Sequence, residues 1–127
     1  VRTIKGAKRF FEAVWMHKYQ GKYYLSYSGK SKLAARAKIL YAMSDSPYGP
    51  FEYKGVLLDK VNSGTNHASI AEYKGQWYMF YHTADLYFQK HPKALKMGKQ
   101  KWYKRSVCMA PLFYNADGSI QKVKVGK

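Results

Sequence analysis

The chain carries one strand pattern twice, and this repeat constrains the fold more than any other feature of the sequence. Residues 18–27 align with residues 72–81 at an offset of 54 positions, so that Gly21 of the first copy matches Gly75 of the second. Each copy has an aromatic strand on either side of a tight turn through glycine, which is typical of a β-hairpin. The sequence therefore predicts two related antiparallel units.

A second pair of strands is predicted after each hairpin, with turn-forming residues between its two strands. Four antiparallel strands that recur after about fifty residues are typical of β-propeller blades. We therefore expect an all-β fold, a partial propeller in which residues 1–60 and 61–127 form roughly one four-stranded blade each. The outer strands are expected at residues 39–43 and 51–58 in the first copy, and at 106–110 and 120–125 in the second.

Composition supports strands, because aromatic residues make up 17% of the chain and thirteen residues are tyrosines. Two inserts interrupt the pattern, at 30–38 and 85–104, and we expect both to be surface loops, with a helical turn at 33–37. Two blades would leave open faces. Such a chain is expected to pack against further propeller blades or against copies of itself.

The chain is strongly basic, with 23 Lys and Arg against 7 Asp and Glu and a formal net charge of +16. This excess attracts polyanions, and the lysines are densest at residues 90–105. That stretch is either a solvated loop or a polyanion site; without a nucleic-acid-binding motif, nucleic acid is not the expected partner. No apolar run is long enough to span a membrane, and the first residues contain no signal-peptide core.

Glu12 is the strongest candidate for chemistry. It starts the first strand of the first copy, and that strand is expected to line the central channel of a propeller. Phe10 and Phe11 precede it and Ala-Val-Trp follows it. Apolar surroundings penalise a charged carboxylate and raise its pKa, which suits a general acid. The alternative is a paired or solvent-facing glutamate at the start of a strand.

Four further side chains are candidates for a binding site. His67 starts the matching strand of the second copy, although a structural histidine fits the same position. Arg105 directly precedes a predicted strand, where it either makes bidentate contacts with a ligand or is solvated with its lysine neighbours. Trp15 and His82 lie on strands where they either pack in the sheet or contact a ligand. His17, by contrast, is predicted to be exposed.

Six ordered blocks of sequence together resemble one known family. Taken in their order along the chain, these blocks are similar to the family 43 glycoside hydrolases, enzymes of the β-xylosidase and α-L-arabinofuranosidase type. The resemblance extends over nearly the whole chain. The resemblance implies a five-bladed propeller, hydrolysis of terminal xylose or arabinofuranose from plant polysaccharide, and a secreted or periplasmic location. The blocks are residues 6–18 with Phe-Phe-Glu-Ala, 21–28, 44–51, 64–70 with Thr-Asn-His, 78–82, and 105–107.

The resemblance also implies roles. In an inverting glycosidase one carboxylic acid protonates the glycosidic oxygen while a carboxylate on the other side activates water. Glu12 corresponds to the general acid, His67 to a histidine beside a hydrated calcium or similar ion, and Arg105 to a substrate contact. Trp15 and His82 complete the expected set of contacts to an oligosaccharide or polysaccharide. No residue is assigned as general base, so the chain alone is expected to be nearly inactive.

Two departures from the family pattern bear on the site. Val14 stands where proline is frequent, and Ala68 stands where a second histidine often follows His67, a change expected to weaken the ion site. Two other functions remain open from the sequence. One is a non-catalytic carbohydrate-binding or assembly module, and the other is a basic β-protein that binds polyanions.

Overall fold

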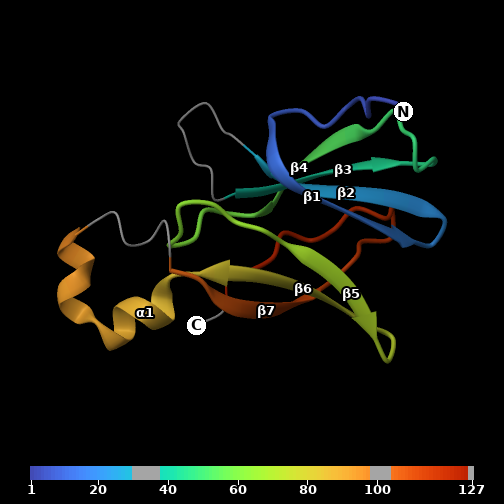
Figure 1. The fold of residues 1–127 in the computed structure, drawn as a ribbon. Coiled ribbons are helices and arrows are strands. Elements are labelled where there is room, and N and C mark those ends of the chain that lie inside the picture. Colours follow the sequence, from blue (N-terminus) through green and yellow to red (C-terminus); the bar gives the residue numbers. More distant parts are fainter. Residues whose placement is uncertain (30–37, 98–103, 126–127) are drawn as a thin grey trace.

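The structure, a computed structural model, describes residues 1–29, 38–97 and 104–125. It contains two antiparallel sheets packed against each other (Figure 1). The all-β prediction is confirmed, and within the described ranges the sheets do not close into a ring. The first sheet has the order β1 (Phe10–Tyr19), β2 (Lys22–Gly29), β3 (Lys38–Ser44), β4 (Glu52–Leu58). The second has the order β5 (Ser69–Tyr73), β6 (Gln76–Thr83), β7 (Ser106–Leu112).

Both predicted hairpins are present, β1 with β2 and β5 with β6. Their two-residue turns have φ values of 46° and 77° at Gln20 and Gly21, and of 50° and 82° at Lys74 and Gly75. Positive φ at both positions is characteristic of a type I′ turn, whose twist matches that of hairpin strands. Glycine at the second position adopts this φ without a steric penalty, which explains why it recurs in the repeat.

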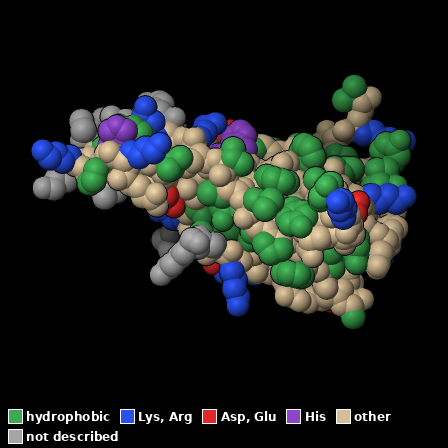
Figure 2. Space-filling view, turned by 90° about the horizontal axis from the view of Figure 1, so that it is seen from below, with side chains coloured by type: hydrophobic (Ala, Val, Ile, Leu, Met, Phe, Trp, Pro, Cys, Tyr) green, Lys and Arg blue, Asp and Glu red, His purple; other side chains and the backbone are tan. Residues whose placement is uncertain are grey.

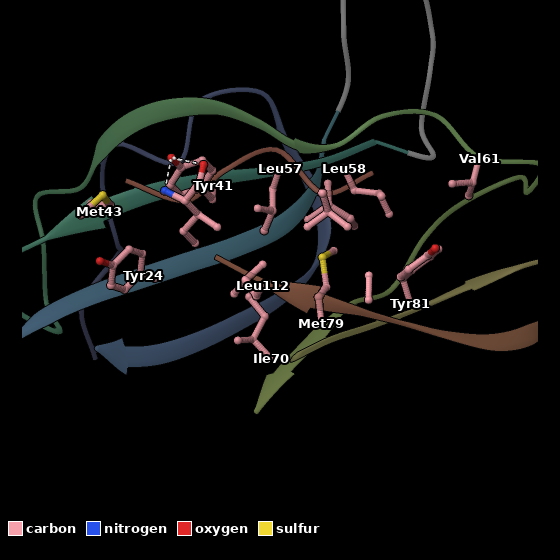
Figure 3. Packing of buried hydrophobic residues seen from close by; sticks show 14 residues of the cluster. Tyr24, Tyr41, Met43, Leu57, Leu58, Val61, Ile70, Met79, Tyr81 and Leu112 are labelled. Atoms are coloured by element: carbon pink, nitrogen blue, oxygen red, sulfur yellow. Dashed lines mark hydrogen bonds between the residues drawn. The ribbon is translucent and has the colours of Figure 1, made fainter. Parts of the chain in front are cut away.

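The main hydrophobic core lies between the two sheets. Along β3, Ile39, Tyr41 and Met43 belong to this core, while Leu40 and Ala42 belong to a second cluster on the opposite face of the first sheet. This alternation follows from the two-residue period of a strand, and both faces of β3 are therefore buried. Figure 3 shows the packing across the gap, where the second sheet contributes Ile70, Met79, Tyr81, Ala110 and Leu112.

The N-terminal segment covers the opposite face of the first sheet. Ile4 and Ala7 pack on the cluster around Leu25 and Phe51. The Tyr27 hydroxyl donates a hydrogen bond of 2.7 Å to the carbonyl of Lys8, and the Phe51 amide donates one of 2.9 Å to the carbonyl of Lys5. These bonds fix the path of residues 4–9 immediately before β1, and so position the start of that strand.

Within the described residues the second sheet has three strands, so the prediction of a fourth strand at 120–125 is wrong. Residues 113–123 instead fold back onto the first sheet, where the Val123 amide donates a 2.8 Å hydrogen bond to the carbonyl of Leu57. Ile120 and Val123 are both buried, and their spacing of three residues does not fit the two-residue period of a strand. The amide of Ile120 donates to the Tyr41 hydroxyl at 3.0 Å, which holds the segment over the core.

The second insert is more ordered than the surface loop that the sequence predicts. It contains the helix α1 (Asp85–Lys90) and a 3-10 helix at Pro92–Met97, and it projects away from the sheets (Figure 1). Phe88 packs with Ala84 and Ala94 in a small core of its own, which explains the order. The helical turn expected at 33–37 lies outside the described residues. No helix within the described ranges is long and apolar enough to cross a membrane.

His17 is buried, contrary to the exposure that the sequence predicts. Its ring stacks on Tyr24 at 4.7 Å between centroids, and its Nε2 lies 2.7 Å from the hydroxyl of Tyr114. Burial lowers the pKa of His17 to about 4. The segment after β7 covers this part of β1. His17, which directly precedes a hairpin turn in the sequence, therefore lies inside an aromatic cluster.

Candidate functional site

Glu12 lies on a distorted part of β1. Phe10 pairs with Gly29, Glu12 with Ser28 and Trp15 with Ser26, so the register shifts on both sides of Glu12. Ala13 has a φ of 61°, a left-handed value that is uncommon for a residue with a side chain. Such β-bulges turn individual side chains away from the regular pleat and are frequent next to active sites. The bulges here set the direction of the Glu12 carboxylate.

Glu12 meets the loop before β5. The Thr65 hydroxyl donates a hydrogen bond of 2.7 Å to Glu12 Oε1, and His67 Nε2 lies 3.6 Å from the same oxygen. The Glu12 and His67 side chains are 40% and 49% exposed. The apolar surroundings predicted for Glu12 are therefore not found, because a hydroxyl and an imidazole face its carboxylate. The pairing of Glu12 with His67 brings together the two candidates from the starts of the two repeats.

His82 holds this loop from behind. Its Nε2 accepts a 3.2 Å hydrogen bond from the amide of His67, and its own amide donates to Asn66 Oδ1 at 3.2 Å. Its Nδ1 lies 3.4 Å from the hydroxyl of Ser63. Burial, with smaller contributions from the charges of Arg105 and His67, lowers the pKa of His82 to about 4. The ring therefore stays neutral near pH 7, which preserves Nε2 as the acceptor for the His67 amide.

Trp15 joins the two sheets beside this cluster. Its indole Nε1 donates a 3.2 Å hydrogen bond to the carbonyl of Ile70 on β5. Trp15 and His67 line an open cleft of about 560 Å³, together with His82 and Val107 from the second sheet. An exposed indole beside an imidazole offers a flat apolar surface and a polar edge, and this combination suits the ring and hydroxyls of a sugar.

Arg105 is exposed and directly precedes β7. Its charge contributes to the lowered pKa of His82, so the guanidinium acts on the same end of the second sheet as the histidines. The five candidates from the sequence thus fall at one end of the molecule, with Glu12 and His67 in direct contact. Their roles in substrate binding remain predictions.

Thr65, Asn66 and Ser63 are parts of the site to which the sequence assigned no role. Thr65 orients the carboxylate, while the buried Asn66 and Ser63 hold His82. Their only signal in the sequence is their position in or beside the Thr-Asn-His block, whose polar residues precede a strand. As an arrangement, a carboxyl group fixed by a hydroxyl at the edge of an open cleft is able to donate or accept a proton at a bound ligand.

The sequence model described as "Glycosyl hydrolases family 43" matches residues 3–120 of the chain. A β-xylosidase of Xylanibacter ruminicola is 47% identical over 117 residues, which cover 91% of this chain and 32% of the relative. A xylosidase/arabinosidase of Bacteroides ovatus is 45% identical over 114 residues, which cover 89% of this chain and 30% of the relative. The chain therefore spans about a third of the length of these relatives.

Solved structures of xylosidases and arabinofuranosidases are also similar to this chain. A β-xylosidase/α-arabinofuranosidase from a compost microbial metagenome, in complex with xylotriose and in calcium-free form, matches with a TM-score of 0.70 and 46% identity. That match covers 91% of this chain and 30% of the solved one. An α-L-arabinofuranosidase of Clostridium thermocellum matches with a TM-score of 0.72 and 46% identity, covering 92% of this chain and 37% of the solved one.

Proposed function

The chain belongs to glycosyl hydrolase family 43, and from this membership we propose that it forms part of an enzyme that removes terminal xylose or arabinofuranose from plant polysaccharide. The names of its relatives, β-xylosidase and xylosidase/arabinosidase, support both sugars. Polysaccharide lies outside the cell, so we also propose a secreted or periplasmic location for the enzyme.

Glu12 is the proposed general acid. The observation that carries this assignment is the 2.7 Å hydrogen bond from Thr65 to Glu12 Oε1, which fixes a half-exposed carboxyl group beside an open cleft. With Oε1 engaged by Thr65, Oε2 is the oxygen proposed to carry the proton. As the glycosidic bond breaks, this proton passes to the leaving oxygen, and the carboxylate that remains is stabilised by the Thr65 hydroxyl.

The general base is proposed to come from outside this chain. Inverting hydrolysis needs a second carboxylate about 6.5–9.5 Å from the acid, with room for the attacking water. No described contact places a second carboxylate of this chain beside Glu12. Because the chain spans about a third of its relatives, we propose that the other two thirds contribute the base.

We propose that the two sheets are neighbouring blades of a five-bladed propeller. The outer face of the second sheet supports this, since Val107 is 82% exposed and Met109 is 58% exposed. Met109 pairs with Phe80 on β6, so the two side chains lie on the same face of the second sheet. Seen from below, hydrophobic side chains gather in one broad patch (Figure 2). A patch of this kind marks a surface that packs against another element, here the next blade or a second copy of the chain.

A calcium ion at the channel is a further proposal. Calcium prefers several oxygen ligands, and an imidazole nitrogen is a poor match for it. Among the described residues no three His, Cys, Asp or Glu side chains form a candidate metal site. His67 would therefore contact such an ion through a water ligand rather than bind it directly. No step of the proposed mechanism depends on the ion.

A chimera tests the assignment of Glu12. This chain would replace the matching segment of the Xylanibacter ruminicola β-xylosidase, which supplies the remaining two thirds. The chimera is expected to hydrolyse xylo-oligosaccharides, and Glu12→Gln is expected to lower kcat by about 10²–10⁴-fold. The loss should be much smaller on an aryl xyloside with an acidic phenol, because that leaving group departs without a proton. Glu52→Gln, at an exposed position on β4, is the matched control.

Two outcomes would contradict the assignment. An equal loss on both substrates would mean that Glu12 has a structural rather than an acid role. Oligosaccharide binding that is unaffected by Glu12→Gln, without turnover in the chimera, would instead favour a non-catalytic carbohydrate-binding module.

A further inference from the structure

The insert between β6 and β7 forms a projecting arm, which we define as residues 85–97 together with Lys104. The arm has its own support, because Phe88, Ala84 and Ala94 pack together and Tyr87 packs against them. The backbone amide and Nδ1 of His91 both donate to the carbonyl of Tyr87, at 2.9 and 3.0 Å. The aromatic side chains of the arm are thus held in place before any ligand arrives.

The arm is strongly cationic. Residues 85–97 and Lys104 include four basic residues, Lys90, Lys93, Lys96 and Lys104, and one acidic residue. That acidic residue, Asp85, accepts a 3.0 Å hydrogen bond from Asn62 at the base of the arm, away from the far end. Lys90 and Lys93 are exposed. Figure 2 shows basic side chains, in blue, and His, in purple, along the arm. A surface with this balance attracts an anionic partner.

An apolar groove runs beside these charges. It has a volume of about 510 Å³ and is lined by Tyr87, His91, Pro92, Lys93 and Ala94. The Tyr87 and His91 rings are stacked, with centroids 4.4 Å apart and planes within 20°. Lys104 Nζ lies 4.7 Å from the centre of the Tyr87 ring. Flat rings beside ammonium groups match a ligand that has both apolar ring faces and negative charges.

Both ends of the arm join the second sheet beside the candidate active site. The chain leaves the second sheet after Thr83 and returns at Ser106, and these two residues pair with each other. His82 and Arg105 flank this pair in the sequence, so both roots of the arm lie at the end of the sheet that carries the histidines. A polymer that contacts the arm would therefore pass close to the cleft.

We propose that the arm binds polysaccharide that carries carboxylate groups, such as xylan substituted with uronic acid, and holds it beside the cleft. A sugar ring would pack on the exposed ring of His91, because Tyr87 is itself covered by His91 and by Lys104. The carboxylates would pair with Lys93 and Lys104. This inference rests on the proposed function for its choice of polymer. The neutral ring faces of a sugar suit the apolar groove, and its scattered carboxylates suit the few separated lysines of the arm.

Binding measured on the full chain tests the proposal without using activity. The probes are a glucuronic acid-substituted xylo-oligosaccharide, a neutral xylo-oligosaccharide of equal length and a single-stranded DNA oligonucleotide. The acidic sugar is expected to bind most tightly, and to weaken as salt screens the charges. Lys93→Gln with Lys104→Gln is expected to weaken it by about tenfold. Lys18→Gln is the matched control, since Lys18 also lies over a tyrosine, at 5.3 Å, but on β1.

A second variant guards against a folding artefact. Tyr87→Leu keeps an apolar side chain on the small core of the arm but removes the ring on which His91 is stacked. It should therefore weaken the binding of both sugars with an unchanged thermal transition. Three results would overturn the proposal: equal affinity for both sugars, no effect of the lysine pair, or preferential binding of the oligonucleotide. These experiments measure binding and not activity. The proposal for the arm can therefore be overturned while the chimera is active, and it can be supported while the chimera is inactive.

Discussion

Glu12 on β1 and Thr65 in the loop before β5 lie 53 positions apart in the sequence, yet the Thr65 hydroxyl donates a 2.7 Å hydrogen bond to Glu12 Oε1. This bond connects the first repeat to the second at the point where chemistry is proposed. It also couples the alignment of the two sheets to the direction of one carboxyl group. A substitution in either sheet that moves these two residues apart should therefore lower the catalytic rate even where the chain stays folded.

Thr65→Val tests this coupling, because valine keeps the shape of threonine but cannot donate. In the chimera it is expected to lower kcat by about ten- to a hundredfold with KM nearly unchanged, since a misdirected acid slows the proton transfer rather than binding. Thr65→Ser, which restores the donor, should recover most of the rate. A large rise in KM, or no recovery with serine, would contradict a positioning role for Thr65.

The repeat made the first sheet and both hairpins predictable, because turn glycines and alternating strands are local signals. The fate of residues 120–125 was not predictable in this way. The partner of Val123 is Leu57, which lies 66 positions earlier, and no local pattern indicates that contact. The predicted exposure of His17 is wrong for the same reason, because the residue that covers it, Tyr114, lies 97 positions later in the sequence.

Glu12 and His67, both predicted to lie in one site, do lie close together, but the apolar surroundings predicted for Glu12 are wrong. The neighbouring phenylalanines in sequence predict an apolar environment only if β1 is regular. The bulges around Glu12 and the left-handed φ of Ala13 redirect the carboxylate toward Thr65. The bulges depend on how β1 pairs within the first sheet and contacts the second, so their effect is visible only in three dimensions.

The buried His17 makes stability depend on pH in the acid range. Its pKa is lowered to about 4 in the folded chain, while the unfolded value is near 6.5. The unfolded state therefore takes up a proton first, and stability is lost as pH falls from about 6.5 to about 4. At pH 5 this amounts to about 2 kcal/mol from His17 alone.

His17→Phe should remove that part of the pH dependence while keeping a ring against Tyr24. Urea unfolding at pH 7 and pH 5 is the measurement, and the difference between the two pH values should shrink by about 2 kcal/mol in the variant. His91→Gln, at an exposed histidine, is the control and should leave the difference as it is. An unchanged difference in His17→Phe would show that the ring is not shielded from protons.

Gly6 should be intolerant of any side chain. It has a φ of 98°, and a Cβ placed there would lie 1.7 Å from the carbonyl oxygen of Phe51. Gly6→Ala is expected to lower the free energy of unfolding by about 3–4 kcal/mol, because the N-terminal segment must move off the first sheet. Gly75→Ala is the comparison, with a φ of 82° but no atom within 4 Å. It should cost only about 1–2 kcal/mol, the strain of the backbone alone. Equal losses in denaturant unfolding would mean that the contact with Phe51 does not form.

Met109→Lys distinguishes a free sheet face from a blade interface. In the chain alone Met109 is 58% exposed, so a lysine there should change the free energy of unfolding by less than about 0.5 kcal/mol. In the chimera the same face is proposed to pack on the next blade, where a lysine would be buried without a partner. There the loss of stability should reach about 2–3 kcal/mol.

Leu86→Lys, at an exposed apolar position on the arm, is the control and should change the stability little in both settings. A similar small effect of Met109→Lys in both settings would mean that no blade covers this face. Sedimentation of the chain alone distinguishes the two partners. If Met109→Lys lowers the association of the chain, the partner of that face is a second copy rather than a blade.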